Sequence, residues 1–244
     1  MVLVIGLTGS IAAGKSTVGQ TLASRGAIHC DADKLVHGLY APGTPGFDKV
    51  VGHFGPEVIG ADGFVDRKIL GAKVFGKPDE MRKLTSAMGN ISEAIHAEIN
   101  KWRDTLGPDD IAVMEAVNLL EPGYSEWCDQ SWIIGVDDAV ARVRLLETRG
   151  MSEAEADQRI KAMVPLERRA PACDWVYKNN GTREELEDAV NTELNRVLGL
   201  YKAGTLPTSV FNRWWEDTRE EREKRLAEMK AKQEAEEAQR AARA

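Results

Sequence analysis

A glycine-rich segment near the amino terminus constrains this chain more than any other feature. Residues 9–16 read Gly-Ser-Ile-Ala-Ala-Gly-Lys-Ser and match G-x-x-x-x-G-K-[ST] at every fixed position. The apolar run at residues 2–7 predicts a strand buried on both faces, and residues 15–25 have apolar side chains at helical spacing. A buried strand, a glycine turn and a helix in this order predict a phosphate-binding loop, with an ordinary tight turn between strand and helix as the alternative.

Each fixed position of this loop has a physical role. Gly9 and Gly14 permit backbone angles that a side chain would forbid, so successive N–H groups turn toward the phosphates. The following helix presents its positive dipole end to the same anion. Lys15 is expected to reach the β- and γ-phosphates of ATP, and the Ser16 hydroxyl to bind Mg²⁺. The loop residues predicted to hold the nucleotide are Gly9, Ser10, Ile11, Ala12, Ala13, Gly14, Lys15, Ser16 and Thr17.

Further apolar runs predict the rest of a sheet. A second strand ends near the acidic pair of Asp31 and Asp33, and later runs lie at residues 111–114, 132–136 and 175–177. Stretches with helical spacing separate these runs. The alternation predicts an α/β fold of the P-loop kinase type with three layers: a parallel sheet of about five strands with helices on both faces.

Composition shifts divide the chain into four parts. We predict one kinase domain over residues 1–204, in which the mostly helical insertion 34–107 builds the acceptor-binding side of the cleft. The polar, arginine-containing segment 149–171 is expected to be a mobile lid. Residues 205–244 become a charged tail, where pairs such as Glu220 with Lys224 stand four apart and favour a solvated helix.

The overall charge and composition limit the classes of partner that this protein is expected to have. A formal charge of −7 argues against a nucleic-acid partner, which would need a basic surface. Three scattered cysteines and four histidines show no ligand spacing. The amino terminus has neither a basic region nor a cleavage site, and no apolar run is long enough to span a bilayer. We therefore expect a cytoplasmic protein without membrane partners, and the sequence does not indicate its oligomeric state.

Two carboxylates follow predicted strands and are candidates for chemistry. Asp33 comes after the second strand, where it could accept the proton of an attacking hydroxyl or help to hold Mg²⁺; the alternative is an aspartate pair that caps the next helix, which suits Asp31 better than Asp33. Glu115 ends the third strand and could bind Mg²⁺ through water, with a solvated strand-end residue as the alternative. The chain lacks the Asn-Lys-x-Asp motif of GTPases, which favours a kinase.

These motifs together resemble the dephospho-CoA kinase family over about residues 3–200. The loop variant Gly6-Leu-Thr-Gly-Ser-Ile-Ala-Ala-Gly-Lys-Ser-Thr17 and the Asp-Ala-Asp element at 31–33 are similar to those of the family. The same holds, in order and spacing, for Pro-Gly-Thr-Pro at 42–45, the segment at 62–70, Pro-Leu-Glu at 165–167, Asp-Trp-Val at 174–176 and Asn-Asn-Gly at 179–181.

The resemblance implies transfer of the ATP γ-phosphate to the 3′-hydroxyl of dephospho-CoA, the last step of coenzyme A synthesis. It implies that Asp33 is the general base and also contacts the substrate, and that Arg67 lies on the acceptor side. It further implies that Arg149 is a lid arginine acting on transition-state charge beside Lys15, and that Asn179 lies near the adenine of ATP.

The chain departs from the family pattern mainly on the acceptor and lid sides. Gly89 and Asn90 stand in place of a His-Pro pair, and Met163 replaces a lid glutamine. The phosphate-binding side is intact. Two alternatives therefore remain: a P-loop kinase of another nucleotide or nucleoside, and a nucleotide-binding protein whose tail engages a partner.

Overall fold

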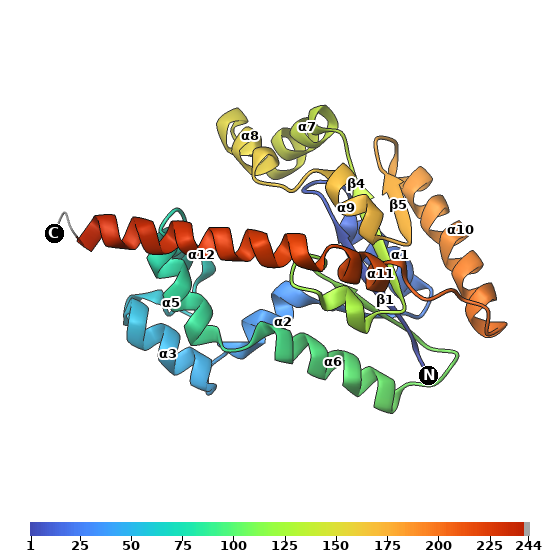
Figure 1. The fold of residues 1–244 in the computed structure, drawn as a ribbon, viewed down its shortest axis with the longest axis horizontal. Helices are drawn as coiled ribbons and strands as arrows, with labels where there is room; N and C mark the ends of the chain where they lie inside the picture. Colours follow the sequence, from blue (N-terminus) through green and yellow to red (C-terminus); the bar gives the residue numbers. More distant parts are fainter. Residues whose placement is uncertain (242–244) are drawn as a thin grey trace.

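A parallel sheet of five strands forms the centre of the molecule in the computed structural model, which describes residues 1–241. Its strand order is β2-β3-β1-β4-β5, and all four pairings are parallel. This arrangement confirms the predicted α/β fold (Figure 1). The strands are β1 (Leu3–Gly9), β2 (Ile28–Asp31), β3 (Ile111–Glu115), β4 (Gln130–Gly135) and β5 (Trp175–Lys178).

Helices cover both faces of this sheet, as predicted (Figure 1). β1 shows why, because it is buried along its whole length. Its side chains alternate between two cores: Leu3, Ile5 and Leu7 pack on one face, and Val4 packs on the other. The first core is closed by α1 (Lys15–Ser24) and α10 (Arg183–Lys202), and the second by α6 (Ile91–Thr105).

The segment between β2 and β3 is helical and has a core of its own. Val50, Phe54, Leu70 and Leu84 are among its buried residues. It therefore forms a separately packed lobe beside the carboxyl end of the sheet (Figure 1). The elements before α6 are α2 (Ala32–Leu39), α3 (Pro45–Phe54), the 3₁₀ turn η1 (Pro56–Val58), α4 (Arg67–Val74) and α5 (Pro78–Met88).

A second group of helices follows β4 and lies at the top of Figure 1, on the other side of the molecule from the helical lobe. Gly150, with φ +61°, ends the first of them, and Ser152 begins the next with a capping box to Glu155. These sharp helix ends fold the segment back toward the sheet. The elements are the 3₁₀ turn η2 (Tyr124–Trp127) before β4, then α7 (Asp138–Arg149), α8 (Glu153–Lys161), α9 (Leu166–Arg169) and the 3₁₀ turn η3 (Ala170–Ala172).

The chain beyond α10 first packs against the domain and then leaves it. In α11 (Val210–Asp217), Phe211 is fully buried, and the Asp174 carboxylate accepts hydrogen bonds from Ser209 Oγ (2.6 Å) and Val210 N (2.9 Å). The charged α12 (Arg219–Ala241) then extends as one long helix away from the amino terminus (Figure 1). Within residues 1–241, none of the helices has both the length and the apolar character needed to cross a membrane.

We predict that Phe211→Ala destabilises the whole protein. Truncating a fully buried phenylalanine leaves a cavity and costs about 3–5 kcal/mol of unfolding free energy. Denaturant unfolding followed by circular dichroism measures this change. Phe75→Ala is the matched control, because that side chain is 67% exposed and its loss is expected to cost less than about 0.5 kcal/mol. Equal costs at the two positions would mean that α11 is not part of the folded domain.

Candidate active site

The carbonyl groups of the glycine-rich loop are bound by side chains of the protein. Lys15 Nζ donates to Gly9 O (2.9 Å) and Ser10 O (3.1 Å). Arg144 Nη1 donates to Ala12 O (3.2 Å), and Asn179 Nδ2 donates to Ala13 O (2.8 Å). Ser10 N donates to Ile134 O (2.9 Å) and Ala13 N to Ser10 O (3.4 Å), so with these oxygens held in place the other N–H groups of the loop are the ones that can receive an anion.

The loop backbone also requires glycine. Gly14 caps α1 in the left-handed region, with φ +98° and ψ +20°. A Cβ there would lie 2.9 Å from both Asn179 Nδ2 and Leu186 Cδ2. At Gly9, a Cβ would lie 2.3 Å from Ile134 O, because Ser10 N already donates to that carbonyl (2.9 Å). The glycines thus bring the loop close to β4 and β5.

Lys15 lies where charges from several elements converge. Burial lowers its pKa below the ordinary value for lysine; Glu115 and Asp33 act to raise this pKa, and Arg169 and Arg149 act to lower it further. Three other predicted site residues, Asp33, Glu115 and Arg149, are therefore close enough to Lys15 to influence its charge. Such an arrangement of cations and carboxylates suits binding and transfer of a phosphoryl group.

The two aspartates after β2 have different contacts. Asp31 caps α2, and its Oδ1 accepts a hydrogen bond from Asp33 N (2.9 Å), as the capping alternative anticipates for this residue. Asp33 stands in the first turn of α2 with an exposed side chain. Its carboxylate therefore remains accessible to a substrate hydroxyl, and its role as general base stays a prediction.

Glu115 has a partner that the sequence did not indicate. It ends β3, and its Oε2 lies 3.0 Å from His29 Nε2 on the neighbouring β2. The register of the two strands explains the contact, because Asp31 pairs with Glu115 and His29 stands two residues earlier on the same face. Only the strand pairing reveals this pair.

Magnesium is the metal that the site chemistry suggests. Ser16 lies exposed in the first turn of α1 and follows Lys15, whose pKa the carboxylates of Glu115 and Asp33 act to raise. Mg²⁺ usually takes one or two protein ligands and completes its shell with phosphate oxygens and water, so these residues fit it. A group of three or more His, Cys, Asp or Glu side chains that could hold a metal ion does not occur in the described part of the chain.

Two arginines of the predicted lid face Lys15 in different ways. Arg149 ends α7 and is exposed. Arg169, at the end of α9, is only 4% exposed and has a larger effect on the Lys15 pKa than Arg149. In the sequence, Arg169 stands out only as part of a polar segment; its burial could not be predicted, since charged residues usually lie at the surface.

Arg67 and its surroundings belong to the helical lobe. Arg67 begins α4 and is exposed. Burial lowers the pKa of His37 on α2, and Arg67 lowers this pKa further. Burial raises the pKa of Tyr40, and Asp33 acts in the same direction. Arg67, His37, Tyr40 and Asp33 therefore form one neighbourhood, which joins the lobe to the edge of the sheet.

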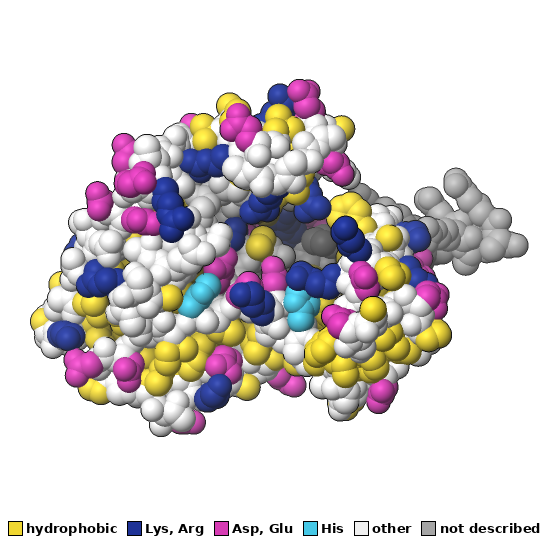
Figure 2. All heavy atoms as spheres, turned by 180° about the vertical axis from the view of Figure 1, so that it is seen from behind, with side chains coloured by type: hydrophobic (Ala, Val, Ile, Leu, Met, Phe, Trp, Pro, Cys, Tyr) yellow, Lys and Arg dark blue, Asp and Glu magenta, His cyan; other side chains and the backbone are white. Residues whose placement is uncertain are grey.

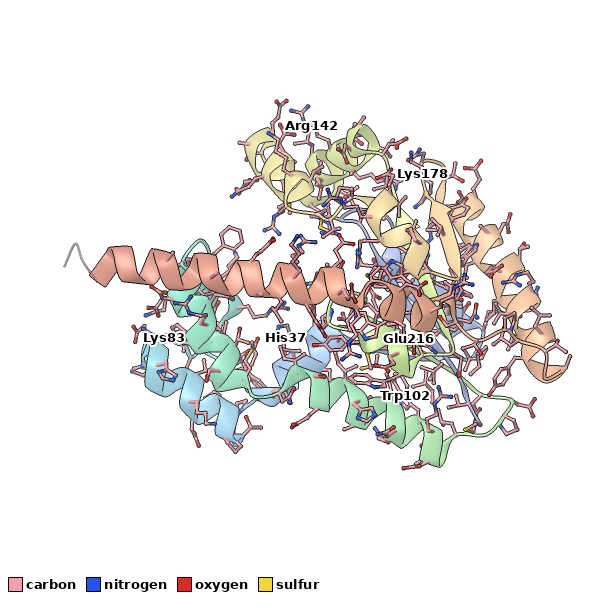
Figure 3. All side chains as sticks on the ribbon, viewed as in Figure 1. His37, Lys83, Trp102, Arg142, Lys178 and Glu216 are labelled. Carbon is pink, nitrogen blue, oxygen red and sulfur yellow. The ribbon has the colours of Figure 1, made fainter. Side chains whose placement is uncertain are left out.

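A hollow lies between the helical lobe and the helices α7 and α8, which adjoin or belong to the predicted lid. Figure 2 shows this hollow with Lys and Arg side chains around it. In Figure 3, Arg142 of α7 marks the lid side and His37 of α2 lies below it. A cavity of about 420 Å³ adjoins the phosphate-binding loop on the lid side; Ser10, Met163 and Lys178 are among its lining residues. Asn179 lies at this edge too, but its side chain is buried against the loop, so contact with adenine stays a prediction.

Replacing Gly14 with alanine is expected to disable the loop. An alanine at φ +98° costs roughly 1–2 kcal/mol in backbone strain, and its Cβ would displace Asn179 or Leu186. We predict at least a tenfold loss of ATP affinity, measured by calorimetric titration. Gly52→Ala in α3 is the control, because a Cβ there meets nothing within 4 Å, and ATP affinity should not change. Unchanged ATP affinity in Gly14→Ala would contradict the assignment of the loop.

Comparison with known proteins gives a consistent result. The sequence model of the dephospho-CoA kinase family matches residues 3–185. Dephospho-CoA kinases of Symbiobacterium thermophilum and Geobacter metallireducens are each 39% identical, covering 76% and 77% of this chain and 79% and 93% of their own lengths. The Streptococcus pneumoniae enzyme is 35% identical over 77% of this chain and 92% of its own.

Two solved structures support the fold. The Thermus thermophilus protein TT1252 superposes with a TM-score of 0.64 at 25% identity, covering 80% of this chain and 98% of its own. Dephospho-CoA kinase from Campylobacter jejuni superposes with a TM-score of 0.56 at 18% identity, covering 79% and 96%. The long family match and the identity of its relatives show that this chain belongs to the dephospho-CoA kinase family.

Proposed function

We propose that this protein is a kinase that transfers the γ-phosphoryl group of ATP to the 3′-hydroxyl of dephospho-CoA. The observation that carries the proposal is the exposed Asp33 carboxylate at the same sheet edge as Lys15, within the range that matches the family. A hydroxyl is a weak acid and needs a proton acceptor, whereas a nucleotide-binding protein without catalysis has no use for one.

Each step of the phosphoryl transfer has a residue proposed for it. The acceptor oxygen forms a bond to the γ-phosphorus while the bond from that phosphorus to the β–γ bridging oxygen breaks, and the electron pair leaves with ADP. Asp33 takes the hydroxyl proton. Lys15 moves from the carbonyls of Gly9 and Ser10 to the phosphates, where its charge is needed. When bound, Mg²⁺ would neutralise charge on the phosphates, held by Ser16 with Glu115 as a candidate through water.

The remaining assignments are proposals of the same kind. Arg149 would approach the transferring group from the lid, Arg67 would contact the acceptor, and Asn179 would border the adenine. Residues 34–107 would form the acceptor-binding side and 149–171 the lid. We also propose a cytoplasmic protein that acts on a small molecule, without nucleic-acid or membrane partners.

A kinase of another nucleotide or nucleoside is the second candidate. Gly89 and Asn90 favour it, because they change the acceptor side while the loop that holds ATP is complete. Release of ADP in the presence of Mg·ATP, compared among dephospho-CoA, adenosine and AMP, separates the two. Turnover with dephospho-CoA alone supports the first candidate. Turnover with another acceptor and none with dephospho-CoA would replace it with the second.

We predict that Asp33→Asn lowers kcat by about 10²–10⁴-fold and leaves ATP affinity nearly unchanged, because only the proton acceptor is lost. The same ADP-release assay and a nucleotide titration measure the two quantities. Asp48→Asn is a matched control: Asp48 is also an exposed acid in the first turn of a helix, α3, so it reports the effect of removing such a charge. Near-normal kcat in Asp33→Asn would remove the general-base assignment.

We expect that phosphoryl transfer does not require the charged tail at residues 205–244 beyond the part that packs against the domain. Truncation after Glu223 keeps Phe211 and also Arg222, whose Cζ lies 3.4 Å from the ring centroid of Trp215. We predict that the truncated enzyme retains kcat within about twofold, since surface changes away from a site have small effects. Loss of turnover on truncation would contradict this prediction and show that the tail contributes to the active enzyme.

A further inference from the structure

Arg169 is a buried charge at the carboxyl end of the central strand. Its Nη2 donates to Thr8 Oγ1 (2.9 Å), Val117 O (2.8 Å) and Glu121 Oε2 (3.3 Å), and its Nε lies 2.9 Å from Glu121 Oε1. Thr8 directly precedes Gly9 and is itself fully buried. These contacts fix the guanidinium beside the first residue of the phosphate-binding loop. Nη1 takes no part in any of them.

A purely structural role does not account well for a charge at this position. Removing a guanidinium from water is costly unless it is fully paired, and the side chain of its counter-ion Glu121 is 40% exposed. Water therefore screens the Glu121 carboxylate more than it screens Arg169. A positive field consequently remains at the edge of the sheet. This field acts on Lys15: of the cations that lower the Lys15 pKa, Arg169 has the largest effect.

The position of Arg169 also differs from that of the lid arginine. Arg149 is exposed at the end of α7, next to Gly150, and must be brought to the substrate by the lid. Arg169 lies against the sheet, held by Thr8 and the segment after β3. A charge fixed before the reaction costs no reorganisation when the transition state forms.

We propose that Arg169 is a catalytic residue of phosphoryl transfer, whose Nη1 contacts the γ-phosphoryl group and stabilises the negative charge on its oxygens. This inference rests on the proposed phosphotransfer and deepens it by adding a fixed cation to Lys15. It does not depend on which acceptor is used, because the γ-phosphoryl group is common to every acceptor.

Arg169→Gln tests the proposal in the full-length protein. Removing one preorganised donor is expected to lower kcat by about 10²–10³-fold with little change in the KM for ATP. Arg168→Gln is the matched control, because it removes the same charge one residue earlier from an exposed side chain and should keep kcat within about twofold. Equal kcat in Arg169→Gln and the control would overturn the proposal.

A second measurement separates catalysis from folding and from the identity of the acceptor. Mg·ADP with aluminium fluoride mimics the phosphoryl group in transfer, and its binding needs no dephospho-CoA. We expect the wild type to bind ADP more tightly when aluminium fluoride is present. In Arg169→Gln this increase in ADP affinity should be at least tenfold smaller, while the affinity for ADP alone should not change. The proposal would be contradicted if aluminium fluoride did not increase the ADP affinity of the wild type. It would also be contradicted if Arg169→Gln lost affinity equally for ADP alone and for ADP with aluminium fluoride.

Arg169→Lys keeps the inference testable if the glutamine variant does not fold. A lysine retains the charge but lacks the planar guanidinium that binds Thr8 and Glu121. We therefore expect a kcat about tenfold lower and a smaller increase in ADP affinity on adding aluminium fluoride. Unchanged kcat and an unchanged gain would show that the guanidinium makes no contact with the transferring group. If the wild type is inactive on dephospho-CoA yet this fluoride effect is present, the acceptor assignment fails and the role of Arg169 stands.

Discussion

The site depends on the binding of the loop's carbonyl oxygens by side chains from two distant parts of the chain. Arg144 of α7 holds Ala12 O and also donates to Asn179 O (3.0 Å), while the Asn179 side chain, just after β5, holds Ala13 O. A loop of this shape would otherwise leave its carbonyl dipoles free to rotate toward the bound anion. α7 and the residue after the last strand therefore help to set the shape of the loop, although neither carries the phosphate-binding motif.

Much of the fold and part of the site could be predicted from local signals in the sequence. The strand before Gly9, the helix from Lys15 and the Asp31 cap are encoded within a few residues, and the structure has all three. The roles of His29 and Arg169 could not be predicted in this way. His29 meets Glu115 only through the pairing of β2 with β3, and Arg169 meets Thr8 across 161 residues. Contacts of this kind follow from topology, which periodicity does not specify.

Lys15 illustrates the cost of such a site. Its ammonium is partly buried without a salt bridge to either Glu115 or Asp33 among the described contacts, and it donates only to loop carbonyls. Burial lowers its pKa, so the charged form is less stable here than in water. A triphosphate would relieve this cost by supplying the missing anion. Arg169 differs, because Glu121 pairs with it (Nε to Oε1, 2.9 Å), so the argument for a ligand with a high negative charge at this sheet edge rests on Lys15.

Gly89 and Asn90 are linked by the backbone at the junction of α5 and α6. Gly89 has φ +86° and ψ −161°, a conformation open essentially to glycine alone, and Asn90 caps α6 through Glu93 N (3.3 Å). A histidine at position 89 would be strained, and a proline at position 90 would lack the capping oxygen. The two departures from the family pair are therefore one structural change: the junction has become a glycine turn with an asparagine cap, which requires both residues together. This turn presents no side chain at position 89, so any acceptor contact made by the family's histidine has to come from elsewhere in the lobe. Arg67, His37 and Tyr40 lie together there beside Asp33.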